Sequence, residues 1–189
     1  MNSSENMKAF LRGRVTLFVG NITEQQVDVI VNAANSTLFG GGGVDGAIHH
    51  AGGPRILEEC KDIRRTRFPQ GLPTGEAVIT TGGHLKARHV IHTVGPIMGK
   101  HGGKEAELLA ACYQNGLALA VQHGLKTIAF PSISTGAYGY PREAAAAVAS
   151  EAIRNFLIRD QHLQEVRLVF YTTGDANVFL RNHRFLDDR

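Results

Sequence analysis

The sequence predicts an α/β domain in which helices cover both faces of a mostly parallel sheet. Apolar, β-branched runs alternate with segments of helical periodicity along most of the chain, as in consecutive βα units. Glycine-rich turns at 40–46 and 134–141 each lie between a strand-like run and a helical segment. The chain has 189 residues, 43% of them hydrophobic, which suits one core. We therefore expect a flexible polar tail over 1–8 and a single domain over 9–189.

The first third of the chain predicts two strands followed by two helices. Residues 14–19 form a strand-like run that stops at Gly20, and 27–31 are typical of a buried strand. Apolar residues then follow helical spacing over 44–51. Pro54 suits the start of a second helix, because its fixed φ fits the first helical position. The first glycine-rich turn therefore leads directly into a helix.

The remainder continues the alternation. Further strands are expected at 77–80, 89–94, 126–131 and 166–171. Apolar residues at helical spacing are found over 108–121, over 145–157, and around Val178 and Phe179. Pro141 can occupy the first position of the helix that contains 145–157. In open α/β sheets, ligands bind at the carboxyl ends of the strands. Both glycine-rich turns are expected at such ends.

The paired turns predict a diphosphate ligand. Glycine lets the backbone approach a ligand closely, and a helix that begins just afterwards directs unpaired N–H groups at an anion. Either turn taken alone could need glycine only for its backbone conformation. Because both turns lie between a strand and a helix, ligand binding is favoured. The chain lacks both the Gly-x-x-x-x-Gly-Lys-Ser/Thr sequence and the dinucleotide fingerprint. Kinase and dehydrogenase functions are therefore not expected.

Charge and cysteine content narrow the class of protein further. The net charge is +3, and a short basic cluster at 61–67 resembles a solvated helix end, so nucleic-acid binding is not indicated. Cys60 and Cys112 are the two cysteines; neither has a metal or redox spacing, so buried free thiols are expected. The polar start and the lack of a long apolar run predict a cytoplasmic protein with no membrane partner.

Several segments also follow one another in the order of a known family. They are VDVIVNAAN at 27–35, GGGGVDGAIH at 40–49, PTGEA at 73–77, HTVGP at 92–96 and FPSISTG at 130–136. With these segments the chain resembles the macrodomains, most of all the bacterial MacroD-type subgroup, from about residue 15 to 171. The resemblance implies a three-layer α/β/α fold with a mixed, mostly parallel sheet. It also implies hydrolysis of O-acetyl-ADP-ribose and of the ester that joins mono-ADP-ribose to acidic side chains, without a cofactor.

The resemblance also implies a set of substrate-binding residues. They are Asn21, Ile22, Asn35, Gly42, Gly43, Val44, Asp45, Ser134, Thr135, Gly136, Ala137, Tyr138 and Tyr171. The two glycine-rich turns would hold the diphosphate and the distal ribose, mainly through backbone N–H groups. Tyr138 would cover the distal ribose and Tyr171 would stack on adenine, although packing roles are open for both rings.

Asp45 and Asn35 are the catalytic candidates that the resemblance implies. Asp45 follows the glycine run at a helix start, where an acid is favoured by the helix dipole in any protein. The implied role is to hold a water between its carboxylate and the α-phosphate; as a carboxylate at a helix N-terminus is a weak base, the phosphate would share the task. The Asn35 amide can donate to and accept from ribose hydroxyls, or cap its loop. Asn32 is assigned a structural hydrogen bond.

The chain departs from the family at the adenine end. Asn21 replaces an Asp that accepts a hydrogen bond from the adenine amino group, so we expect weaker adenine preference. Thr172, Thr173 and Gly174 follow Tyr171 where acidic residues are usual. Gly52 replaces a usual alanine and disfavours the helix by about 1 kcal/mol.

Nine histidines raise the possibility of a metal site. His49 and His50 are adjacent and should diverge on a helix, and His89 and His92 should point to opposite faces of a strand. With no cysteine at a metal-ligand spacing, we expect a metal-free hydrolase. Its ligands would be ADP-ribose, O-acetyl-ADP-ribose and mono-ADP-ribosylated proteins, with nucleic acid only as ADP-ribosylated ends. A non-catalytic ADP-ribose reader remains the main alternative, and poly-adenylate binding the third.

Overall fold

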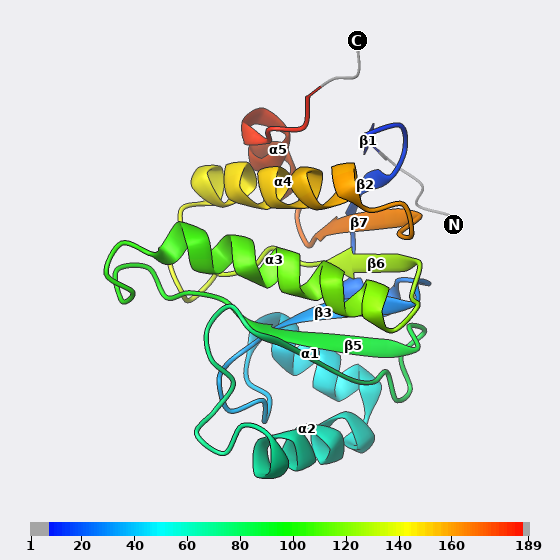
Figure 1. Ribbon diagram of the computed structural model, residues 1–189, viewed down its shortest axis with the longest axis vertical. Helices are drawn as coiled ribbons and strands as arrows, with labels where there is room; N and C mark the ends of the chain where they lie inside the picture. Colours follow the sequence, from blue (N-terminus) through cyan, green and yellow to red (C-terminus); the bar gives the residue numbers. More distant parts are fainter. Residues whose placement is uncertain (1–7, 187–189) are drawn as a thin grey trace.

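The computed structural model describes residues 8–186, in which a seven-stranded mixed sheet forms the centre (Figure 1). In chain order the strands are β1 (Lys8–Phe10), β2 (Val15–Val19), β3 (Val29–Ala34), β4 (Ala77–Thr81), β5 (His89–Val94), β6 (Thr127–Phe130) and β7 (Glu165–Phe170). In space their order is β1-β2-β7-β6-β3-β5-β4. The five inner strands are parallel, and β1 and β4 add antiparallel edges.

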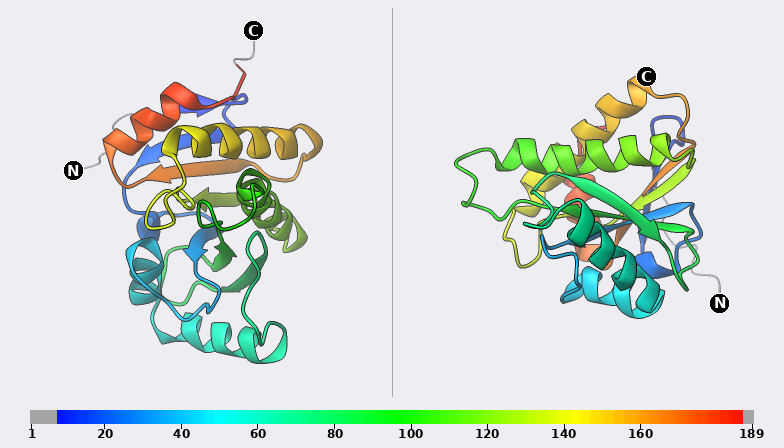
Figure 2. Two further views of the ribbon diagram at one scale, coloured as in Figure 1. Left: turned by 90° about the vertical axis from the view of Figure 1, so that its left-hand side faces the viewer. Right: turned by 60° about the horizontal axis from the view of Figure 1, so that its bottom comes forward.

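Helices cover both faces of this sheet, as Figure 2 (right) shows. They are the 3₁₀ turn η1 (Ile22–Glu24), α1 (Gly43–Gly52), α2 (Pro54–Thr66), α3 (Glu105–Gln122), α4 (Arg142–Arg159) and α5 (Thr173–Asn182). The helices α3, α4 and α5 pack on one face, and η1, α1 and α2 on the other. The predicted three-layer α/β/α fold is confirmed.

Alternation along the strands fills the two cores. In β3, Val29 and Val31 enter the core with α3 and α4, whereas Ile30 between them enters the core with α1 and α2. In β6, Phe130 likewise enters the core with α3 and α4, and Ala129 enters the core with α1 and α2. Successive side chains of a strand point to opposite faces, so a parallel strand buried on both sides becomes an unbroken apolar run. This is why the inner strands can be predicted from sequence.

The structure corrects several expected boundaries. Lys8, assigned to the tail, begins β1, while residues 1–7 of that tail lie outside the described part. The strand β1 was missed because it has three residues, of which only Phe10 is half-buried, and is defined by pairing with β2. Pro141 precedes α4 as its N-cap and is not its first residue. None of the helices within 8–186 has the length and apolar character needed to cross a membrane.

Four neighbouring strands end at the same side of the sheet, onto which Figure 2 (left) looks. Gly20 follows β2, Tyr171 follows β7, Pro131 follows β6 and Asn35 follows β3. These strands are adjacent in the order β2-β7-β6-β3. Parallel pairing therefore brings the two glycine-rich turns, which follow β3 and β6, to one edge of the sheet.

Candidate active site

A cleft of about 490 Å³ opens at this edge of the sheet. Its lining residues come from five segments: Gly20, Asn21, Ile22, Gly43, Val44, Ala47, Pro131, Ser132, Val169, Phe170, Tyr171 and Asp175. Five of the predicted binding residues are among them, namely Asn21, Ile22, Gly43, Val44 and Tyr171. The others, in the segments 35–42 and 134–138 and at Asp45, are not among its lining residues.

The start of α1 presents backbone donors to the cleft. Gly42 is the N-cap, and it has no side chain that could satisfy the first N–H groups of the helix. Gly43 adopts a φ of +58°, in the left-handed region that favours glycine. A Cβ on Gly46 would overlap the carbonyl oxygen of Gly41, so the first turn packs directly against the loop. The arrangement has the donors and dipole of an anion site.

Asp45 lies in the first turn of α1 and is 5% exposed. Its Oδ1 accepts a hydrogen bond of 2.7 Å from Asn32 Nδ2. The Nε2 atom of His49, one turn further along the helix, lies 3.5 Å from the same oxygen. Burial raises the pKa of Asp45 above its usual value, while Asn32 and His49 act in the opposite direction. The assignment of Asn32 to a structural hydrogen bond is confirmed, and its partner is Asp45 itself.

Asn35 lies beside Asp45, with the backbone of Gly41 between them. A Cβ on Gly41 would lie 3.2 Å from Asp45 Oδ2 and 3.3 Å from Asn35 Nδ2. The structure therefore brings both catalytic candidates to one spot. The Asn35 amide also closes its own loop: Nδ2 donates to the carbonyl oxygen of Gly40 at 3.0 Å, and Oδ1 accepts from the backbone N–H of Thr37. Loop capping, which the sequence left open, is thus present.

The second glycine-rich turn is held in a strained but well-connected conformation. Ser134 has a φ of +66°, which costs a non-glycine residue energy and is often found at functional sites. The N–H of Tyr140 donates to the carbonyl oxygen of Ser134, and that of Met98 to the carbonyl oxygen of Tyr138. A Cβ on Gly95 would overlap Ser134 Oγ, so the HTVGP segment must have glycine where it contacts the turn.

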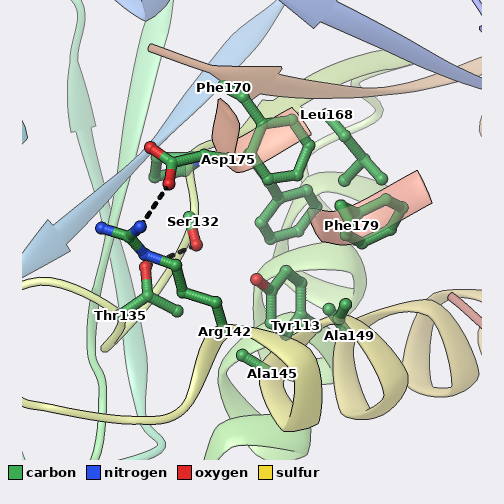
Figure 3. A pocket seen from close by; sticks show the side chains of 13 residues that line it. Tyr113, Ser132, Thr135, Arg142, Ala145, Ala149, Leu168, Phe170, Asp175 and Phe179 are labelled. Carbon is green, nitrogen blue, oxygen red and sulfur yellow. Dashed lines mark hydrogen bonds and ion pairs between the residues drawn. The ribbon is translucent and has the colours of Figure 1, made fainter. Parts of the chain in front are cut away.

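A small cavity of about 30 Å³ lies beneath the second turn (Figure 3). Arg142, at the start of α4, reaches across it to Asp175 of α5 with an N–O distance of 3.0 Å. Ser132 and Thr135 are joined by a hydrogen bond of 2.6 Å at the base of the turn. The first contact joins α4 to α5, and the second closes the base of the turn.

The opposite end of the cleft is more exposed. Tyr171 is 83% exposed, which excludes the alternative of an ordinary core tyrosine. Asn21 caps η1: its Oδ1 accepts from both the backbone N–H and the hydroxyl of Thr23, at 3.0 and 2.8 Å. Thr172 caps α5 by accepting from the N–H of Asp175. Two of the departures from the family, Asn21 and Thr172, are therefore helix caps in this chain.

Sequence reasoning missed two features of the site. Asp175 lines the cleft, and the Thr172-x-x-Asp175 spacing could have indicated its helix cap but not its location. His49, Cys60 and His92 also come together, with ligand-type atoms all within 4.8 Å of one another. No spacing in the sequence indicated this cluster, because three separate elements, α1, α2 and β5, supply its residues.

Comparison with known proteins identifies the family. The Macro domain family model matches residues 31–149. A macro domain-containing protein of Caldanaerobacter subterraneus subsp. tengcongensis is 51% identical over 94% of this chain and 99% of its own. An O-acetyl-ADP-ribose deacetylase of Escherichia fergusonii is 49% identical, over 90% of this chain and 96% of its own. The Oceanobacillus iheyensis macrodomain with ADP superposes with a TM-score of 0.89 at 44% identity, covering 94% of this chain and 93% of that one. On sequence and structure alike, the chain belongs to the macrodomain family.

Proposed function

We propose that this protein binds ADP-ribose and hydrolyses O-acetyl-ADP-ribose and the ester between mono-ADP-ribose and acidic side chains. One observation carries the proposal: the buried Asp45 carboxylate and the Asn35 amide flank a single spot beside Gly41, at the edge of the cleft. The name of the Escherichia fergusonii relative supports the same substrate class.

The diphosphate would lie between the two glycine-rich turns. The uncapped start of α1 supplies N–H donors and the positive end of the helix dipole. The backbone at 134–138 faces it from the carboxyl end of β6. At the other end of the cleft, the exposed ring of Tyr171 offers a face on which a base can stack. The distal ribose would then lie over Gly41, within reach of Asn35 and Tyr138.

The chemistry is ester hydrolysis by a positioned water. The water oxygen attacks the ester carbonyl carbon, and the bond from that carbon to the ribose oxygen breaks. The proton lost by the water is taken up by Asp45 or the α-phosphate and finally by the departing ribose oxygen. The products are ADP-ribose and a free carboxylic acid. Burial raises the pKa of Asp45, which makes it a better base than an exposed carboxylate.

A non-catalytic ADP-ribose reader is the alternative. It is favoured by the Asn35 amide, which already spends its carbonyl oxygen and one N–H on its own loop. A reader needs the diphosphate site and the base platform but no positioned water. The two functions therefore differ in what Asp45 contributes after the ligand has bound.

Single-turnover hydrolysis of O-acetyl-ADP-ribose tests the proposal, together with ADP-ribose affinity measured by calorimetry. We expect Asp45→Ala to slow release about 10²- to 10⁴-fold, the usual contribution of a general base, while affinity changes far less. Asp62→Ala, which removes an exposed acid of α2, is the matched control. Binding without release by the unaltered protein would establish a reader, and equal losses of rate and affinity in Asp45→Ala would refute the catalytic role.

A further inference from the structure

A chain of buried polar side chains runs from the edge strand β4 to Asp45. It begins at Thr80 of β4, passes through His92 of β5 and Asn32 of β3, and ends at Asp45 in α1. The successive distances are 2.9, 3.1 and 2.7 Å. Thr80 is 3% exposed, and Asn32 and His92 are fully buried. Asn32 and His92 face each other in the parallel register of β3 and β5.

The proton positions in this chain follow from its chemistry. The Asp45 carboxylate accepts, so Asn32 Nδ2 is the donor to it. The same Nδ2 atom faces His92 Nδ1, which must therefore accept and carry no proton. Burial lowers the pKa of His92 to about 3, so the ring is neutral and its proton is on Nε2. That proton is donated to Thr80 Oγ1, whose own hydroxyl donates to the carbonyl oxygen of Thr81.

The chain fixes the orientation of one amide. If the Asn32 amide were flipped, its oxygen would face two acceptors, Asp45 Oδ1 and His92 Nδ1. The observed orientation instead leaves Asn32 Oδ1 buried without a hydrogen-bond partner among the described residues. Buried polar atoms are almost always paired, so an unpaired one needs an explanation. The explanation here is that both Nδ2 hydrogens are required elsewhere.

We propose that Asn32 and His92 are positioning residues for Asp45: His92 holds the Asn32 amide in one orientation, and Asn32 directs the carboxylate toward the spot beside Gly41. The inference rests on the proposed function. Burial also raises the pKa of the neighbouring Cys60 thiol to about 12, so this thiol is protonated.

The first test is to measure the pKa of Asp45 by an NMR titration that observes its carboxyl carbon. Asp45 is faced by Asn32 of β3 and by the titratable groups His49 of α1 and Cys60 of α2, with His92 behind Asn32. Removing a donor to the carboxylate disfavours its charged form. We therefore expect Asn32→Ala to raise the pKa of Asp45, and His92→Leu to raise it less. In His92→Asn, whose amide oxygen can replace Nδ1 as acceptor, the original value should return.

The second test is the single-turnover rate beside ADP-ribose affinity. Misplacing a catalytic group by about 1 Å can cost on the order of 100-fold in rate, so Asn32→Ala should lose about 10- to 100-fold in rate and less than about threefold in affinity. Thr80→Val, which keeps the side-chain shape, should show a smaller loss that Thr80→Ser restores. Thr93→Val is the matched control. Thr93 is buried next to His92 on β5, but its hydroxyl donates to the carbonyl oxygen of Glu76 and not to the residues that lead to Asp45.

The outcomes separate the two proposals. Unchanged rate and unchanged Asp45 pKa in Asn32→Ala and Thr80→Val would overturn the positioning role while leaving the hydrolase assignment intact. Equal effects in Thr93→Val and Thr80→Val would mean that these hydrogen-bonded side chains only stabilise the fold. That result would also overturn the positioning role. If the unaltered protein releases no product, the proposed function fails, and the Asp45 titration still decides whether Asn32 and His92 control that carboxylate. Where Asn32→Ala does not fold, Thr80→Val and His92→Asn decide between these outcomes.

Discussion

The two ends of the cleft are built in different ways. At the proposed catalytic end, Asp45, Asn32, His92 and Thr80 are buried, and each is held by a partner on a neighbouring strand or helix. At the proposed base end, Asn21 and Tyr171 are exposed, and Asn21 is held by Thr23, two positions away in the sequence. The position of the Asp45 carboxylate therefore depends on the core, whereas the exposed end of the cleft can change without disturbing the fold.

The sharpest way to test this comparison is a change of pH. His92 is neutral in the folded protein because burial lowers its pKa from 6.5 to about 3. Unfolding restores the ordinary value, so the unfolded chain binds a proton that the folded one does not. Stability from this site is complete above pH 6.5 and is lost as pH falls toward 3, by about 1.4 kcal/mol per pH unit.

The measurement is the free energy of unfolding in denaturant at pH 7 and pH 4.5, for the unaltered protein and His92→Asn. Asp45 acts in the opposite sense, because its raised pKa adds stability as pH falls, so the difference between the two proteins isolates His92. We expect the unaltered protein to lose about 2 to 3 kcal/mol more than the variant. The same loss in both would show that the catalytic end is not sealed from protons.

Gly46→Ala should break the catalytic end through packing. The added Cβ would overlap the Gly41 carbonyl oxygen, which is backbone and cannot move aside alone. Overpacking of this kind costs about 1 to 3 kcal/mol, and displacement of the loop should weaken ADP-ribose binding as well. Thermal unfolding and calorimetry check both effects. Gly42→Ala is the control for folding, since a Cβ there meets nothing within 4 Å; equal melting temperatures for the two variants would contradict the expectation.

Tyr171→Ala should weaken binding without affecting the fold. The ring is 83% exposed, so its removal should change the free energy of unfolding by less than about 0.5 kcal/mol. Loss of a stacking platform costs about 1 to 3 kcal/mol of binding per base. Calorimetry with ADP-ribose gives the affinity, and Tyr171→Phe should behave like the unaltered protein. Undiminished affinity in Tyr171→Ala would remove this residue from the proposed site.

Asn21→Asp should produce the smallest change, a gain of about 1 kcal/mol in ADP-ribose binding. Both lone pairs of Asn21 Oδ1 are used by Thr23, which leaves the amide with donors alone for the base. A carboxylate has further acceptor positions for the adenine amino group. The same measurement is made with a second ligand, an ADP-ribose analogue that carries a carbonyl in place of the adenine amino group. The affinity of Asn21→Asp for this analogue should be lower than that of the unaltered protein. A parallel change for both ligands would show that Asn21 does not contact the base.

Most of the architecture was predictable because each element carries a local signal. The inner strands are unbroken apolar runs, and α1 and α2 begin after glycine or at proline. The sequence also placed both glycine-rich turns at strand ends, and the resemblance placed Asp45 and Asn35 beside the first of them. The edge strand β1 had no such signal, since it is short, partly exposed and defined by its partner.

The sequence by itself determined the periodicities, the turns and the residue types of the site, because those depend on neighbours a few positions apart. The tertiary structure alone decided what surrounds Asp45. Asn32 and His92 are 60 residues apart and Asn32 and Asp45 are 13 apart, and they meet only because the strand order β4-β5-β3 aligns their registers beneath α1. The protonation of His92, the orientation of the Asn32 amide and the basicity of Asp45 are consequences of that burial, and no local pattern encodes them.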